Sequence, residues 1–128
     1  MTLKDYQEKA MTTCMPSSEN FSYMFLNLVG EVGEFASKVA KLIRKENVTI
    51  GGFVDESLPP YNHLSFKKAD EYDKQMSELM KEAGDILWQL SGLCTIMGWS
   101  LEDVAQMNLD KLASRNQRGV IDGNGDNR

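Results

Sequence analysis

Two long segments of the chain carry apolar residues at intervals of three and four, the spacing of one face of an α-helix. In the first segment the apolar positions are Phe25, Leu28, Val29, Val32, Phe35, Ala36, Val39 and Ile43. In the second, which runs from about Phe66 to Met97, they are Met76, Leu79, Ala83, Ile86, Leu87, Leu90, Leu93, Cys94 and Met97. Long helices that each need a partner for an apolar face predict an all-α fold, a bundle of helices.

Shorter helices are expected around these two. The segment from Leu3 to Cys14 reads as a short helix, and the Ser17-Ser18 pair is expected to cap the long helix after it, near Glu19. Gly98 is expected to end the second long helix, and Ser100 with Asp103 resembles a capping box that starts a last helix, Leu101 to about Arg115. The 128 residues therefore predict one domain of about four helices.

Residues 47–65 have no sustained helical period and contain Gly51-Gly52 and Pro59-Pro60, so they are expected to form a long connection. A connection of this length is either a functional flap or a linker. His63 lies in it and reads as a solvated loop histidine rather than a metal ligand. Residues 116–128 are rich in glycine and read as a C-terminal tail.

Trp88 and Ile96 widen the apolar face of the second long helix beyond one stripe. A face this wide has to be covered, which predicts a helix from another subunit and hence a homo-oligomer.

The net charge of −5 argues against nucleic-acid binding, which depends on Lys and Arg to neutralise phosphates. The first 11 residues contain no apolar secretory region, and the apolar stretch from Ile86 to Trp99 is too short and too interrupted to span a bilayer. Cys94 lies in an apolar helical run far from Cys14, which favours free thiols over a disulfide. We therefore expect a cytoplasmic protein with no membrane or nucleic-acid partner.

Each long helix carries two carboxylates three residues apart, Glu31 with Glu34 and Glu82 with Asp85. A separation of three is roughly 60° of helical rotation, so both acids of a pair share one face, at the border of the apolar stripe. Carboxylates gathered there repel each other and lose hydration unless a cation joins them. Oxygen ligands of this kind suit Mg²⁺, with Mn²⁺ as a second possibility.

Glycines accompany both acid pairs, although each glycine in a helix costs about 1 kcal/mol against alanine. Gly30, Gly33 and Gly84 would allow two helices to approach closely, or would allow a ligand to lie against the backbone. The main alternative to a metal site is a structural ion-pair network of the acids with Lys38, Lys41 and Lys81. On the last helix Asn108, Lys111 and Arg115 share one face, and such a face holds polyphosphate or is simply solvated.

Glu31-Val-Gly-Glu34 followed by Glu82-Ala-Gly-Asp85 resembles the E-x-x-E…E-x-x-D signature of the all-alpha nucleoside triphosphate pyrophosphohydrolases, the MazG-like superfamily. The residues around both pairs and the glycine-rich tail are also similar to that family. The resemblance implies a dimeric or tetrameric bundle that binds magnesium through the four acids and splits a nucleoside triphosphate into monophosphate and pyrophosphate. By position, Asn108, Lys111 and Arg115 would hold phosphates, with Lys38 and Lys41 as further contacts.

The corresponding mechanism is metal-assisted hydrolysis in which the acids orient the metal and a water. One of the four acids, or Glu78 one turn before Glu82, would accept the proton. Two other hypotheses stay open: a non-catalytic oligomeric bundle that binds nucleotide or metal for regulation, and a diiron bundle. The diiron hypothesis ranks last because the Glu-x-x-His pair that it needs is absent from the sequence.

Overall fold

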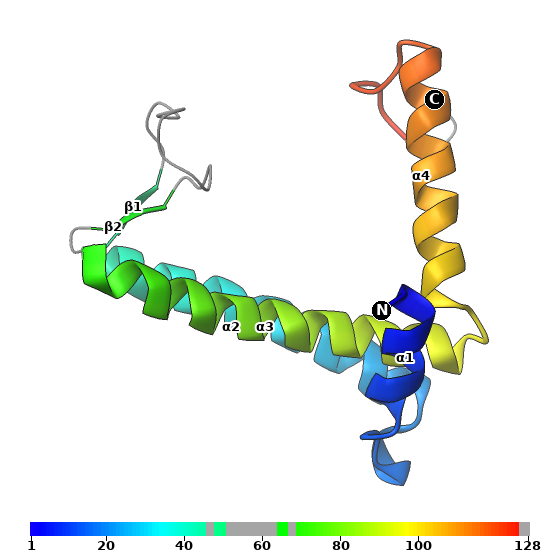
Figure 1. Ribbon diagram of the computed structural model, residues 1–128, viewed down its shortest axis with the longest axis horizontal. Helices are drawn as coiled ribbons and strands as arrows, with labels where there is room; N and C mark the ends of the chain where they lie inside the picture. Colours follow the sequence, from blue (N-terminus) through cyan, green and yellow to red (C-terminus); the bar gives the residue numbers. More distant parts are fainter. Residues whose placement is uncertain (46–47, 51–63, 67–68, 126–128) are drawn as a thin grey trace. The chain divides into compact units, whose positions relative to one another are not determined.

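Four α-helices account for most of the structure. The computed structural model describes residues 1–45, 48–50, 64–66 and 69–125. Its helices are α1 (Leu3–Met11), α2 (Phe21–Arg44), α3 (Ala69–Ile96) and α4 (Leu101–Gln117), and a 3-10 turn, η1 (Pro16–Ser18), precedes α2 (Figure 1). The predicted all-α fold is confirmed, and each of the four expected helices is present.

Two short strands stand at the ends of the long connection. β1 (Val48–Ile50) and β2 (Leu64–Phe66) pair antiparallel, with Thr49 opposite Ser65. Sequence analysis expected no strand here, and the helix that was expected from Phe66 begins instead at Ala69. The parts of the connection that carry Gly51-Gly52, Pro59-Pro60 and His63 lie outside the described residues.

The start of α2 differs from the prediction in its cap. Asn20, rather than Ser17 or Ser18, caps the helix, because its side-chain Oδ1 accepts a hydrogen bond from Tyr23 N at 2.9 Å. Ser17 and Ser18 are part of η1. Between α3 and α4 the residues behave as predicted: Gly98 follows α3 with a φ of +71°, and Ser100 Oγ accepts from Asp103 N, which is one half of the expected capping box. The helix expected to reach Cys14 ends at Met11, and α4 extends to Gln117.

The chain divides into two compact units. The first consists of Met1–Met24 and Leu90–Arg128, and in it α1 contacts α4. Gln7 of α1 donates to Thr95 Oγ1 and to the Trp99 carbonyl, and its Oε1 accepts from Leu101 N, so one side chain holds α1 against the turn between α3 and α4. Met24, Cys94 and Leu101 are the buried apolar residues described in this unit.

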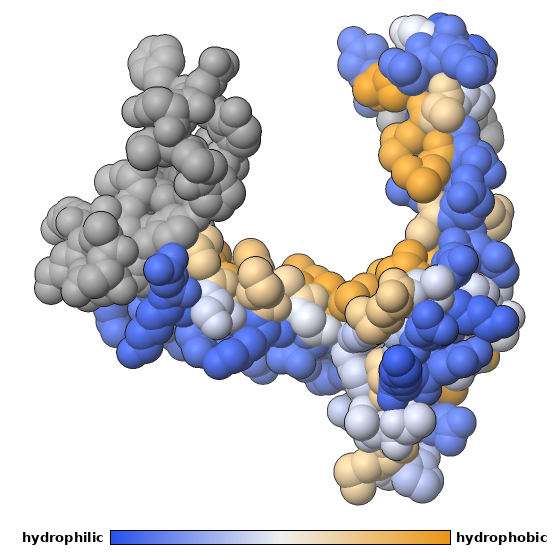
Figure 2. Space-filling view, viewed as in Figure 1, coloured by the Kyte–Doolittle hydropathy of each residue, from blue (hydrophilic) through white to orange (hydrophobic). Residues whose placement is uncertain are grey.

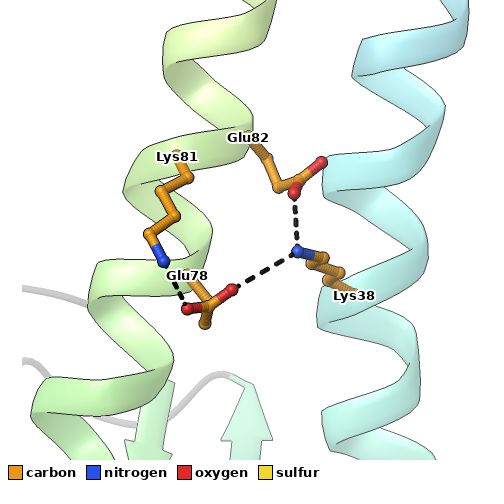
Figure 3. A network of polar contacts seen from close by, with 4 residues as sticks. All are labelled: Lys38, Glu78, Lys81 and Glu82. Carbon is orange, nitrogen blue, oxygen red and sulfur yellow. Dashed lines mark hydrogen bonds and ion pairs between the residues drawn. The ribbon is translucent and has the colours of Figure 1, made fainter.

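The second unit, Phe25–Gln89, contains most of α2 and α3 and the two strands. In it α2 and α3 lie side by side, with β1 and β2 at one end (Figures 1 and 3). Leu42 and Leu79 are its buried apolar residues among those described. Much apolar surface stays open, and Figure 2 shows such side chains gathered along one side of the helix pair.

Both cysteines are free, and Cys94 is buried as expected. Burial raises the pKa of the Cys94 thiol, so this side chain behaves as a small apolar group rather than as a nucleophile. None of the described helices has a stretch long and apolar enough to cross a membrane.

Candidate metal centre

Three carboxylates from two helices converge in the second unit. Glu31 and Glu34 lie one turn apart on α2, and Glu82 lies on α3. Each offers an oxygen such that the three atoms are all within 4.8 Å of one another. The E-x-x-E spacing places the first two acids on one face of α2, and the packing of α3 against α2 supplies the third.

The nearby carboxylates affect the pKa of Glu31. Its pKa is raised, first by burial and then by the negative charges of Glu34 and Asp85. Asn27, one turn earlier, opposes the shift by donating to Glu31 Oε1 at 3.1 Å. Asp85 is not one of the three acids with converging oxygens, although its negative charge contributes to raising the pKa of Glu31.

Glu82 is the most deeply placed of the acids, with 8% of its surface exposed. Its Oε1 accepts a hydrogen bond from Lys38 Nζ at 2.5 Å. Its Oε2 is buried and has no hydrogen-bond partner among the described residues. A buried carboxylate oxygen without a hydrogen-bond partner is costly, so a cation beside Glu82 would compensate this atom.

Two lysines, Lys38 and Lys81, form ion pairs with acids of α3, as the alternative of an ion-pair network expected (Figure 3). Lys38 reaches Glu82 and lies 3.9 Å from Glu78 Oε2, while Lys81 pairs with Glu78 Oε1 at 2.7 Å. The hydrogen bond from Lys81 lowers the pKa of Glu78, which makes this carboxylate a weaker proton acceptor. In the described part of the chain, Lys38 pairs with Glu82 of the four acids Glu31, Glu34, Glu82 and Asp85, so this pair compensates only part of their negative charge.

The glycines beside the acids face open space in the described part of the chain. A Cβ added at Gly33 or Gly84 would meet nothing within 4 Å, and one at Gly30 would meet only Asn27 of the same helix, at 3.6 Å. Packing of α2 against α3 therefore does not require these glycines. The exposed backbone at these positions is compatible with the other explanation, room for a ligand beside the acids.

The three phosphate-binding candidates of α4 lie in the first unit. Asn108 and Lys111 are exposed. Arg115 is 6% exposed, and its Nη2 donates to the Gly125 carbonyl at 3.3 Å. In this structure the Arg115 guanidinium thus holds the tail against the end of α4, a role that the sequence pattern did not indicate.

A comparison with known protein families decides what kind of protein carries this acidic site. The family model of the MazG nucleotide pyrophosphohydrolase domain matches residues 19–120, which include both acid pairs and the α4 candidates. The chain belongs to the MazG family. Membership implies a nucleotide pyrophosphohydrolase activity, and it confirms the resemblance seen in the sequence.

A relative of the chain is found in a bacteriophage. The Gene 37 protein of Mycobacterium phage L5 is 36% identical over 112 residues, which cover 88% of this chain and 80% of the relative. Its name does not describe an activity. No solved structure matches the chain.

Sequence analysis did not name Asn27 as a partner at this MazG site, and it named Lys38 as an ion-pair partner of the acids without saying which acid it contacts. Asn27 stands four residues before Glu31, and that spacing was a readable signal for a contact along one helix. The bond between Lys38 and Glu82 joins residues 44 apart and depends on how α2 and α3 align. No spacing in the sequence encodes that alignment.

Proposed function

We propose that this MazG protein hydrolyses nucleoside triphosphates to nucleoside monophosphate and pyrophosphate, with Mg²⁺ held by Glu31, Glu34, Glu82 and Asp85. The observation that carries the proposal is the convergence of three carboxylate oxygens within 4.8 Å, together with the buried Glu82 Oε2, which has no hydrogen-bond partner in the described part of the chain. Hard divalent cations bind carboxylate oxygens, retain waters and accept substrate phosphates as further ligands. Mn²⁺ would suit the same oxygens.

The chain's own residues have separable tasks in this reaction. The four acids hold and orient the cation, and Asn27 fixes the Glu31 carboxylate through its hydrogen bond. When bound, the cation supplies the positive charge that binds substrate phosphates and offsets charge developing at the reacting phosphorus. The open space at Gly33 and Gly84 leaves the backbone beside the acids accessible to the substrate.

Phosphate binding is assigned to Lys38, Lys41, Asn108, Lys111 and Arg115. The two lysines of α2 lie one and two turns beyond Glu34, so they extend the acidic site with positive charge. Arginine contributes forked donors and lysine a point charge. For Arg115 this role requires its hydrogen bond to the Gly125 carbonyl to be exchanged for one to phosphate.

We also propose that the protein acts as a homo-oligomer, a dimer or a tetramer. Phe25, Val29 and Val32 recur at helical spacing on α2 and are 48%, 61% and 50% exposed in the single chain. A second copy of the chain would cover this face.

The direct test is pyrophosphate release from ribo- and deoxyribonucleoside triphosphates, with and without Mg²⁺, with the nucleotide product identified. Glu82→Gln keeps the size of the side chain and removes its charge, so we expect a folded protein whose turnover falls about a hundredfold or more. Glu8→Gln on α1 is the matched control, and it should leave turnover unchanged. Full activity of Glu82→Gln would contradict the assignment of the site.

A further inference from the structure

Lys38 has two acidic partners of different depth. Its Nζ lies 2.5 Å from Glu82 Oε1 and 3.9 Å from Glu78 Oε2 (Figure 3). The Glu82 side chain is 10% exposed, whereas the Glu78 side chain is 42% exposed. The two acids lie one turn apart on α3, so a small movement of the lysine stem shifts the ammonium from the buried acid to the exposed one.

The bond to Glu82 occupies a carboxylate that the metal site needs. Glu82 is one of the three acids whose oxygens converge, and an ammonium on its Oε1 places positive charge at the edge of that cluster. A divalent cation on the same carboxylate would be repelled by the ammonium. The two cations therefore oppose each other at Glu82.

Glu78 is prepared to receive the displaced ammonium. Lys81 donates to Glu78 Oε1 at 2.7 Å, whereas the oxygen nearer to Lys38 is Oε2. Glu78 can thus bind both lysines at once, one on each oxygen. The move leaves Lys38 paired and frees Glu82 Oε1 for the site.

We propose that Lys38 is a displaceable internal counter-ion, which covers Glu82 in the metal-free protein and moves to Glu78 when a divalent cation binds. This inference rests on the metal site of the proposed function. It assigns Lys38 a task before any substrate arrives: the ammonium compensates a buried carboxylate that would otherwise be charged and unpaired, at the expense of metal affinity. Lys38 is here a positioning residue for the metal.

The test is direct binding of Mn²⁺ to the full-length protein without nucleotide, measured from the electron paramagnetic resonance signal of free Mn²⁺. Lys38→Met should tighten binding about tenfold, the size of a typical coupling between two ligands that oppose each other. Lys74→Met, which removes a charge from an exposed position two turns before Glu82 on α3, is the matched control and should change binding much less. Lys38→Gln keeps a donor for Glu82 and should also tighten binding, so it serves if the methionine variant does not fold.

Glu78→Gln completes the experiment. If Glu78 receives the ammonium, this substitution should weaken Mn²⁺ binding in the otherwise unchanged protein and have a much smaller effect when Lys38 is already methionine. Equal effects in the two backgrounds, or Mn²⁺ binding that is no tighter in Lys38→Met and Lys38→Gln, would overturn the inference and leave the metal site standing. If neither the unchanged protein nor any variant binds Mn²⁺, the metal site of the proposed function fails together with the inference.

Discussion

The acids of the candidate site differ in what surrounds each carboxylate. Glu82 is buried; Lys38 donates to one of its carboxylate oxygens, and the other oxygen has no partner among the described residues. Glu34, in contrast, is exposed. Glu31 lies between these extremes, with Asn27 as its partner. Glu82 Oε2 on α3 is therefore the carboxylate oxygen that a bound cation would stabilise most, and Glu82→Gln is the most informative substitution.

Asp5, a carboxylate outside the site, should make the stability of α1 depend on pH. Asp5 caps α1 in a reciprocal pair with Thr2, and the Thr2 backbone N–H that donates to it lowers the pKa of Asp5 below its ordinary value of 3.8. Because the folded pKa is the lower one, Asp5 stabilises α1 above pH 3.8, and that contribution is lost as the pH falls through the folded pKa. An NMR titration should place the Asp5 pKa below 3.8.

Thr2→Ala provides the control for this titration. It removes the hydroxyl but keeps the backbone N–H, which is the larger cause of the shift, so the Asp5 pKa should rise only part of the way to 3.8. An Asp5 pKa at or above 3.8 in the unchanged protein would show that the cap does not form.

Residue spacing in the sequence predicted the acids of the site but not the contacts between separate segments. The three-residue separations pointed to Glu31, Glu34 and Glu82, whose oxygens converge in the structure, because contacts along one helix follow from its geometry. That these acids and Asp85 bind a metal stays a prediction. The sequence offered Lys38 as an ion-pair partner of the acids, but it indicated neither that Lys38 contacts Glu82 in particular nor that Arg115 is buried. Both depend on how separate segments pack, and a chain alone does not show that.

At the scale of elements, one side chain connects α1 to the turn that leads into α4. Gln7 makes three hydrogen bonds, to Thr95, Trp99 and Leu101. Gln7→Ala removes all of them and leaves Leu101 N without its acceptor, so we expect a loss of about 1–3 kcal/mol in the free energy of unfolding. Urea unfolding of Gln7→Ala and of the unchanged protein would measure this difference in the free energy of unfolding.

Gln106→Ala is the matched control for Gln7. Gln106 is exposed, and its side chain donates within its own helix to Asp110 Oδ1 at 2.8 Å, so its substitution should cost little in the free energy of unfolding. Equal stability of the two variants would mean that the Gln7 contacts do not hold α1 in place.

The helices themselves were predictable from periodicity, but their ends were less so. Apolar spacing placed α2 and α3 well, since that pattern extends over many residues. The cap of α2 was assigned to Ser17 or Ser18 although Asn20 provides it, because several residues in that segment are chemically able to cap. β1 and β2 escaped prediction because three-residue strands are too short to show a period.

For the whole molecule, the exposed apolar face of α2 predicts self-association. Light scattering after size exclusion should give the mass of a dimer or tetramer. Val29→Lys places a charge in the middle of the face and should shift the protein toward monomer, whereas Ser17→Lys adds the same charge at an exposed polar position and should not. A monomeric unchanged protein would contradict the proposal.

The central claim is that a cation held by the four acids drives hydrolysis of a nucleoside triphosphate, and pyrophosphate release tests it most directly. The account predicts monophosphate and pyrophosphate from at least one triphosphate in the presence of Mg²⁺, no release without divalent cation, and loss of release in Glu82→Gln but not in Glu8→Gln. Release that is unchanged by removal of divalent cations, or that persists in full in Glu82→Gln, would contradict it.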